Sequence, residues 1–292
     1  MLNYFARHFG DRPDGWRVRK VNDVNWLIPY IMRTRLDSQN HFDERVSVEK
    51  VEQFIRAHRK EIPELSTMHV FVAAMVRLLA LRPQLNRFVM WNKLFARNRI
   101  EMSLMVKRAF SDEGEETAIK PSFQPEDTIY DVVRRMQEEI EAKGRVGQSA
   151  GIDKTAHLLG LFPPFLLRFV IFLFRWMDNL WCVPRFIYDA SPFHCSFFLT
   201  NVGSLGIGSI YHHLYEFGTC SIFLALGRKG RTASGGKTVS LRFVLDERIC
   251  DGYYYAYSMR VLRRILANPD VLLTPPEEVV VDDGVTYARV DR

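Results

Sequence analysis

The feature that most constrains the fold is a strand, a polar turn and a helix in direct succession near the C-terminus. Residues 239–245 alternate between apolar and polar side chains, which is typical of a half-buried strand. Residues 253–266 follow a helical pattern. Between them lies the turn Asp246-Glu247-Arg248-Ile249-Cys250-Asp251-Gly252, whose glycine we expect to allow a tight bend. This segment predicts a sheet strand that passes through a polar corner into a helix.

The order of the remaining elements predicts an α+β fold with a mixed sheet. Strands and helices alternate without a regular βαβ repeat, which argues against a doubly wound fold. Ser66 or Thr67 can cap one of the helices, and Asp127 can cap another. The expected strands are 28–36, 93–96, 100–110, 195–202, 220–226 and 238–245, the expected helices 48–58, 67–81 and 127–142, and the expected loops 111–116, 203–208 and 231–236.

Composition restricts the class of protein. The 292 residues are 47% hydrophobic, enough for one large core, and the net charge of +6 is not gathered into a Lys/Arg run, so we expect no nucleic-acid partner. The four cysteines form no C-x-x-C pair and no metal spacing, which indicates free thiols and no metal. The first residues lack the apolar core of a signal peptide. We therefore expect a cytoplasmic protein.

Residues 158–181 are unusually apolar and include a Phe-rich run from 165. Pro163 and Pro164 interrupt the start, and Arg168, Arg175 and Asp178 interrupt the rest, so a membrane-spanning helix is the least favoured interpretation. One interpretation is a helix that is buried on most sides or packed in an oligomer interface. The other is a helix lying in a membrane surface through residues 165–181, with its arginines near lipid phosphates.

Three segments, in order, carry a family resemblance. They are the helix-to-turn run that ends in Arg82-Pro83-Gln84-Leu85-Asn86, the strand Phe197-Phe198-Leu199-Thr200-Asn201-Val202-Gly203, and the 246–252 turn. Together they resemble the superfamily of chloramphenicol acetyltransferase and the dihydrolipoyl acyltransferase catalytic domain. The turn departs from that superfamily's H-x-x-x-D-G signature because Glu247 stands where the catalytic histidine is placed.

The resemblance implies a two-layer sandwich in one catalytic domain, with a core of about 15–270 and a C-terminal tail at 271–292. It implies a coenzyme A thioester as acyl donor, a small-molecule hydroxyl or thiol as acceptor, and a homotrimer with its active site at a subunit boundary. No lipoyl-carrying domain or Ala/Pro-rich linker is recognisable, so a stand-alone relative is expected. Binding residues for coenzyme A cannot be assigned from the motifs.

The resemblance gives Glu247 the place of the general base that deprotonates the acceptor. A solvated glutamate is a weak base toward a thiol or alcohol, and burial in an apolar channel would strengthen it. The alternative is a structural carboxylate paired with Arg248 or Arg242. The reverse substitution Glu247→His separates a decayed enzyme from a rebuilt one.

Other site residues follow from the same resemblance. Thr200 matches the hydroxyl that donates to the oxyanion of the tetrahedral intermediate, although a threonine also suits a strand by shape. Asp251 matches an aspartate that forms a buried ion pair with an arginine near the N-terminus, for which Arg19 or Arg17 is the candidate here. Gly252 follows it in the turn.

The adjacent pair His212 and His213 is the other candidate group. Either could supply the base that Glu247 does not, oriented by Glu247 or Glu216, and the alternative is ordinary surface polarity. The pair could also bind a metal, but no carboxylate or cysteine lies at a convincing spacing. His194 and His41 are weaker candidates of the same kind. The resemblance thus implies an acyltransferase, with a non-catalytic trimeric scaffold as the alternative.

Overall fold

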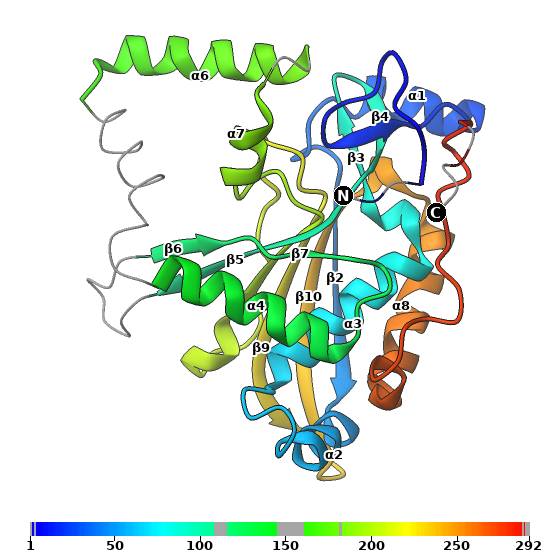
Figure 1. The fold of residues 1–292 in the computed structure, drawn as a ribbon, viewed down its shortest axis with the longest axis vertical. Helices are drawn as coiled ribbons and strands as arrows, with labels where there is room; N and C mark the ends of the chain where they lie inside the picture. The colour runs from blue at the N-terminus through cyan, green and yellow to red at the C-terminus, as the bar shows by residue number, and fades with distance from the viewer. Residues whose placement is uncertain are drawn as a thin grey trace.

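A computed structural model describes residues 2, 4–107, 116–144, 161–180, 183–287 and 289. Its centre is a seven-stranded sheet with the order β2-β10-β9-β8-β5-β6, and β7 pairs with the start of β5 (Figure 1). The pairs β5–β8 and β8–β9 are parallel and the others antiparallel, so the sheet is mixed, as predicted. The strands are β2 (Gln39–Ser47), β5 (Ile100–Lys107), β6 (Glu116–Ile119), β7 (Ser122–Phe123), β8 (Phe197–Asn201), β9 (Ile222–Arg231) and β10 (Lys237–Asp246).

Helices cover one face of this sheet and enclose the main core (Figure 1). They are α2 (Glu49–His58), α3 (Thr67–Leu81), α4 (Ile129–Gly144) and α8 (Gly252–Ala267). Helix α3 is buried along nearly its whole length, and it begins where predicted because Ser66 and His69 form a capping box. The backbone N–H of Ser66 donates to Nδ1 of His69 at 3.2 Å. The α+β sandwich expected from the sequence is confirmed.

The second face of the sheet is only partly covered. Alternation along β8 puts Phe197 and Leu199 in the main core and Phe198 on the opposite face. There Phe198 packs in a smaller cluster that includes Phe223, Val244 and Leu214, the last from the segment between β8 and β9. This outer face carries the candidate residues of the 197–203 motif.

A small sheet, β1-β4-β3, sits at the N-terminal end of the fold. It consists of β1 (Gly15–Arg17), β3 (Arg87–Met90) and β4 (Lys93–Arg97), with a two-residue turn at Trp91 and Asn92. Arg87 also fastens the chain beyond α8, since its guanidinium forms a two-point ion pair with buried Asp282, with both N–O distances 2.6 Å. The segment expected to be a tail therefore packs onto the body up to Tyr287.

Two local predictions are wrong. Residues 28–36 were expected to form a strand, but α1 (Asp23–Ile31) occupies the first part because Asn22 caps it by accepting from the N–H of Asn25. Asp127 does not cap α4, because its carboxylate accepts from the N–H of Gln124 and pairs with Arg135. The acidic loop 111–116 lies outside the described residues except for Glu116, which begins β6.

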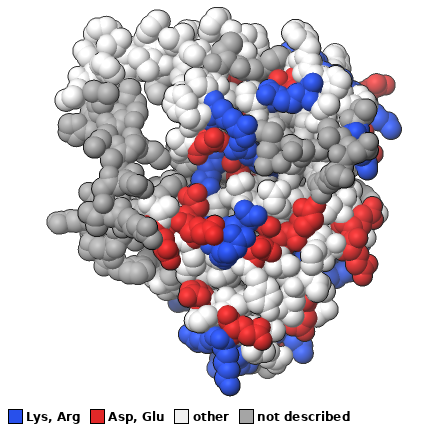
Figure 2. All heavy atoms as spheres, viewed as in Figure 1, with Lys and Arg blue, Asp and Glu red and all other residues white. Residues whose placement is uncertain are grey.

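The Phe-rich segment forms α6 (Pro164–Asn179), which runs along the edge of the molecule (Figure 1). Its side chains are mostly exposed, including Phe165 at 74% and Phe172 at 63%, so within one copy the helix is not buried on most sides. Figure 2 shows this end of the molecule almost free of acidic side chains. In the part of the chain that is described, no helix has the length and apolarity to cross a membrane. A short helix, α7 (Arg185–Ala190), follows.

Candidate active site

The turn after β10 is held by a buried ion pair within the turn itself. The Asp246 carboxylate, fully buried, accepts from Nε and Nη2 of Arg248 at 2.8 and 2.7 Å, and from Oγ of Ser38 at 3.1 Å. A two-point guanidinium–carboxylate pair fixes both position and orientation. The turn η3 (Glu247–Ile249) is therefore rigidly placed at the end of the sheet.

Glu247 lies half-buried in this turn, and its backbone N–H donates to the carbonyl of Ser38 at 2.8 Å. The structural partners expected for its carboxylate are engaged elsewhere. Arg248 pairs with Asp246, and Nη1 of Arg242 donates to the carbonyl of Ser209. Among the described residues, neither arginine forms an ion pair with Glu247, so the carboxylate is not held by either of its expected structural partners.

The predicted ion pair between Asp251 and Arg19 is wrong. Asp251 is exposed and caps α8, with its carboxylate accepting from the N–H of Tyr254 at 2.7 Å. Arg19 lies over the ring of Tyr287, 4.5 Å from its centroid, and donates to the carbonyl of Phe9. The physical reason is that the turn is already oriented by a buried ion pair of its own, between Asp246 and Arg248.

Gly252 is also less constrained than predicted. It is the first residue of α8, its φ lies outside the left-handed region, and a Cβ built there meets no atom within 4 Å. The turn therefore does not require glycine on steric grounds.

Thr200 lies on the outer face of the sheet, in register with Ala225 of β9 and, beyond it, Arg242 of β10. Its side chain is partly exposed. Gly203 follows closely, and a Cβ on it would lie 2.4 Å from the carbonyl oxygen of Gly227. This close approach of two backbones, possible only with glycine, fixes the segment that passes beside Thr200.

His212 lies over the same face as Thr200. Its ring stacks on Phe223 with centroids 3.9 Å apart, and Phe223 is two residues before Ala225, the partner of Thr200. Burial lowers the pKa of His212, which favours a neutral ring near pH 7. Its Nδ1 lies 3.1 Å from the carbonyl of His213. A carbonyl can only accept, so Nδ1 carries the proton and Nε2 keeps a lone pair for accepting one.

His213 and His41 are placed less favourably. His213 is exposed, and its ring stacks on the His212 ring with centroids 4.7 Å apart. His41 lies on the edge strand β2 and packs its ring against Tyr211. Glu216, proposed as an orienting group, instead accepts from the N–H of Leu36 at 2.8 Å.

Thr200 and Glu247 lie far apart within one copy. Asp246 is four residues along β10 from Arg242, which stands in the same cross-sheet row as Thr200, two strands away. At about 3.3 Å per residue and 4.8 Å per strand, the Cα atoms of Thr200 and Asp246 are separated by roughly 16 Å. The two side chains of one copy cannot both reach one acyl carbonyl.

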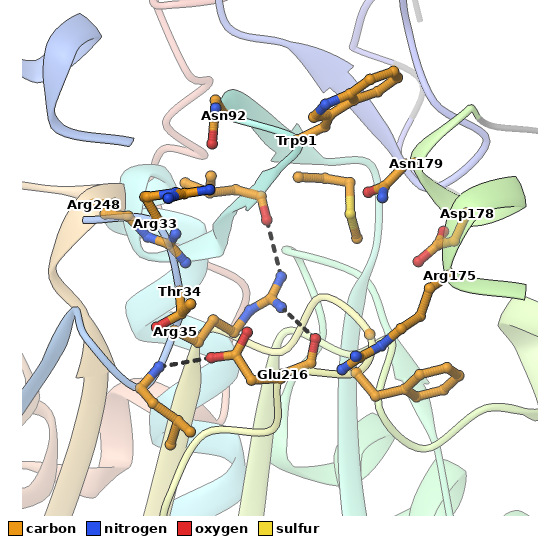
Figure 3. Close-up of a pocket in the computed structure, with 15 residues that line it drawn as sticks. Arg33, Thr34, Arg35, Trp91, Asn92, Arg175, Asp178, Asn179, Glu216 and Arg248 are labelled. Carbon is orange, nitrogen blue, oxygen red and sulfur yellow. Dashed lines mark hydrogen bonds between the residues drawn. The ribbon is translucent and has the colours of Figure 1, made fainter. Parts of the chain in front are cut away.

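A pocket of about 610 Å³ opens beside the 246–252 turn, at the Glu247 end of the sheet (Figure 3). Its walls come from the segment after α1, the β3–β4 turn, the end of α6 and the 216–218 loop, with Arg248 from η3. The four arginines that line it are Arg33, Arg35, Arg175 and Arg248. No local signal in the sequence points to this site, because Arg33 and Arg35 fall in a segment expected to be a strand and nothing local joins them to Arg175.

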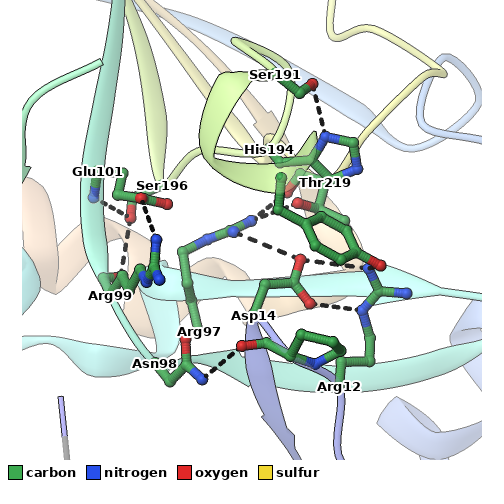
Figure 4. A network of polar contacts seen from close by, with 12 residues as sticks. Arg12, Asp14, Arg97, Asn98, Arg99, Glu101, Ser191, His194, Ser196 and Thr219 are labelled. Carbon is green, nitrogen blue, oxygen red and sulfur yellow. Dashed lines mark hydrogen bonds and ion pairs between the residues drawn. The ribbon is translucent and has the colours of Figure 1, made fainter. Parts of the chain in front are cut away.

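A second polar group, centred on Arg12, is buried beneath the small sheet (Figure 4). Arg12 is fully buried and pairs with Asp14 and Asp178, each at 2.8 Å. His194 lies between Ser191, 2.8 Å from Nδ1, and Asp178, 3.2 Å from Nε2. The cavity that His194 lines together with Tyr188 is about 10 Å³. That is too small for a substrate, so this Ser–His–Asp arrangement fastens α6 and α7 to the N-terminal segment.

No group of three or more His, Cys, Asp or Glu side chains among the described residues is arranged to hold a metal ion. Cys195, Cys220 and Cys250 are buried free thiols. Burial raises the pKa of the Cys250 thiol to about 12, so it carries no nucleophilic thiolate at neutral pH.

No protein-family model matches this chain, and no curated protein matches its sequence. Solved structures do match. A chloramphenicol acetyltransferase aligns with a TM-score of 0.54 and 11% identity over 83% of this chain and 94% of its own. The chain has the chloramphenicol acetyltransferase fold. The same fold is found in a probable dihydrolipoamide acetyltransferase from Listeria monocytogenes, with a TM-score of 0.53 and 14% identity over 85% of this chain and 93% of that one.

The dihydrolipoamide acetyltransferase of Azotobacter vinelandii is a further match, with a TM-score of 0.51 and 14% identity over 86% of this chain and 88% of its own. A serine, a histidine and an asparagine have been investigated in its catalytic mechanism. The resemblance drawn from the three motifs is confirmed for the fold. The roles of Thr200, Glu247, His212 and His213 stay predictions.

Proposed function

We propose that this protein is a cytoplasmic acyltransferase that moves an acyl group between a coenzyme A thioester and a hydroxyl or thiol of a small-molecule acceptor. The observation that carries the proposal is the position of Thr200. In a fold shared with acetyltransferases, it stands on the strand where the motif places the oxyanion donor, with its side chain partly exposed on the outer face of the sheet.

In the proposed reaction a base takes the proton of the acceptor hydroxyl or thiol, whose oxygen or sulfur attacks the thioester carbonyl. The tetrahedral oxyanion then accepts from the hydroxyl of Thr200. One such donor is worth about 3–4 kcal/mol of transition-state stabilisation. Collapse of the intermediate expels the coenzyme A thiolate, which recovers a proton from the conjugate acid of the base.

Two residues are candidates for the base, and they predict different sites. His212 lies on the same face as Thr200, with Nε2 available, so it would complete a site within one copy. Glu247 follows Asp246, whose Cα atom is roughly 16 Å from that of Thr200 in the same copy, so Glu247 would act on a substrate held by Thr200 of another copy. His213 is exposed, and we assign it a supporting role: its backbone carbonyl accepts the Nδ1 proton of His212 and so leaves Nε2 of His212 as the basic atom.

Self-association is part of the proposal, with a homotrimer as the expected state. A structure that this chain matches with a TM-score of 0.50 is the cubic core of a pyruvate dehydrogenase multienzyme complex. The outer face of the sheet, where Thr200 and Arg242 are partly exposed, is a suitable surface for a second copy. A mass measurement in solution tests the state, and a monomer would contradict a site that joins Thr200 and Glu247.

The experiment for the activity is titration with coenzyme A and short acyl thioesters, followed by release of free thiol in the presence of alcohol and thiol acceptors. We expect Thr200→Ala to lower kcat by about 100-fold or more while thioester binding persists. Thr200→Ser, which keeps the hydroxyl, is the matched control. Failure of all thioesters to bind would favour the alternative, a non-catalytic scaffold.

A second role, contact with a membrane surface, is supported by α6. Phe165, Phe169, Phe172 and Trp176 are more than half exposed, and the exposed charges on the helix are Arg168 and Arg175. Aromatic side chains beside arginines suit an anionic lipid surface. We expect the protein to sediment with phosphatidylserine vesicles and only weakly with phosphatidylcholine vesicles. The double variant Phe169→Ser/Phe172→Ser should sediment with neither. If the wild-type protein binds no vesicles and the double variant has a lower mass in solution, α6 instead forms an interface between copies of the chain.

A further inference from the structure

Positive charge around the pocket beside η3 exceeds negative charge. Four arginines and two carboxylates, Asp178 and Glu216, line it. The Asp178 carboxylate is turned into the buried network, where it accepts from Arg12 and Tyr188 at 2.8 and 2.9 Å. Glu216 is therefore the one lining carboxylate that is not already paired with a cation outside the pocket.

Three of the arginines have no carboxylate of their own. Arg35, although 95% buried, donates only to the backbone carbonyls of Val89 and Glu216, and its Nε has no hydrogen-bond partner. Arg33 and Arg175 are exposed at the mouth. Among the described residues, no ion pair is recorded for any of the three. Only Arg248 has a matched partner, Asp246.

The arginines converge on the cavity from different elements. Figure 3 shows Arg33 and Arg248 on one side and Arg175 on the other, with Arg35 between them. Guanidinium groups with their N–H donors directed into one space match the geometry of a phosphate group, which accepts at several oxygens. Arg35 donates to carbonyls, and the carboxylates of Asp246 and Glu216 attract it from nearby while the Arg248 guanidinium repels it. An anion in the cavity would add to the compensation of this buried charge.

The pocket also bears backbone strain at one wall. Trp91 and Asn92 form the turn between β3 and β4 with φ of 49° and 56°, in the left-handed region. A two-residue hairpin turn of this kind favours Asn-Gly, and a bulky residue at the first position is an outlier. Such strain is characteristic of ligand sites. The Trp91 ring, 56% exposed, stands at the mouth where it can stack on an organic group.

We propose that this arginine-lined pocket binds a phosphate-bearing organic molecule, with the phosphate among Arg33, Arg35 and Arg175 and its organic part against Trp91. A volume of about 610 Å³ accommodates such a ligand. The binding does not depend on the proposed acyl transfer. The same chemistry is offered by the phosphates of coenzyme A and by a phospholipid headgroup, which α6 would bring close through Arg175.

Calorimetric titration with inorganic pyrophosphate at constant ionic strength tests the pocket directly. We expect saturable binding that weakens about tenfold in Arg175→Gln and in Arg33→Gln, each of which removes one charge-assisted contact at an exposed position. Arg168→Gln is the matched control, because it removes the same charge from the same exposed helix two turns earlier, outside the pocket. It should bind as wild type does.

Two further arms identify the source of the phosphate. Displacement of pyrophosphate by coenzyme A would assign a nucleotide-type ligand, and displacement by phosphatidic acid vesicles but not by phosphatidylcholine vesicles would assign a lipid headgroup. Trp91→Phe should leave pyrophosphate binding intact and weaken whichever organic phosphate competes. Absence of saturable pyrophosphate binding, or an equal loss in Arg168→Gln and Arg175→Gln, would overturn the proposal.

Discussion

The two aspartates of the 246–252 turn, five residues apart, should contribute very differently to the stability of the fold. Asp246→Asn removes the charge that compensates buried Arg248 and lies beside buried Arg35. Breaking a buried pair by removing one partner costs about 3–5 kcal/mol, because the remaining guanidinium stays desolvated. Asp251→Asn, by contrast, exchanges two equally good helix caps and should change stability by less than about 0.5 kcal/mol.

Urea unfolding followed by circular dichroism measures the difference. With a denaturant dependence near 3 kcal/mol per molar for a chain of this size, Asp246→Asn should lower the midpoint by roughly 1 M or more, while Asp251→Asn leaves it nearly unchanged. Adding Arg248→Met to Asp246→Asn should recover part of the loss, because the uncompensated charge is then gone. The reasoning is refuted if Asp251→Asn costs as much as Asp246→Asn, or if the double variant is the least stable.

Three other outcomes follow from particular contacts. Trp91→Gly, which suits φ of 49°, should raise stability by about 1 kcal/mol in urea unfolding while weakening ligand binding in the pocket, and a loss of stability would show that the turn is unstrained. Gly203→Ala should destabilise by more than about 1 kcal/mol, because its Cβ would meet the Gly227 carbonyl at 2.4 Å, whereas Gly208→Ala, in open space, should be nearly silent. Burial lowers the pKa of His194, so as the pH falls below about 6.5 the unfolded chain takes up a proton before the folded protein does, and the stability of the fold declines. His194→Gln should make the stability less dependent on pH in this range. An unchanged slope of stability against pH would contradict the prediction.

The sequence predicted the elements whose signals are local. Helix α3 lies where predicted because its cap at Ser66 and its stop at Pro83 are written within the segment. The strands that became β8, β9 and β10 were predicted because alternation and glycine-containing turns bound them. The α1 region was misassigned because the Asn22 cap outweighs alternation, and because the alternating side chains of Tyr30 and Leu36 are exposed, Tyr30 on the helix and Leu36 after it.

The site was less predictable, because it joins residues distant in the sequence. Arg35, Arg175 and Arg248 converge although each is more than seventy residues from the next, and no periodicity within a segment encodes that meeting. The sequence also did not show that Asp246, and not Asp251, forms the buried ion pair with an arginine. Each caps a helical element, Asp246 the short turn η3 and Asp251 the helix α8, and only burial decides which of them holds an arginine.

The measurement that tests the central claim most directly is subunit complementation of acyl transfer. Thr200→Ala and Glu247→Gln proteins are unfolded together, refolded as a mixture and compared with each variant refolded alone. If Thr200 of one copy works with Glu247 of another, each variant alone is inactive, and the mixture regains activity through the intact sites formed where two variants meet. If Glu247→Gln refolded alone is active while Thr200→Ala refolded alone is inactive, the base is His212 within one copy. Transfer unaffected by Thr200→Ala would contradict the account.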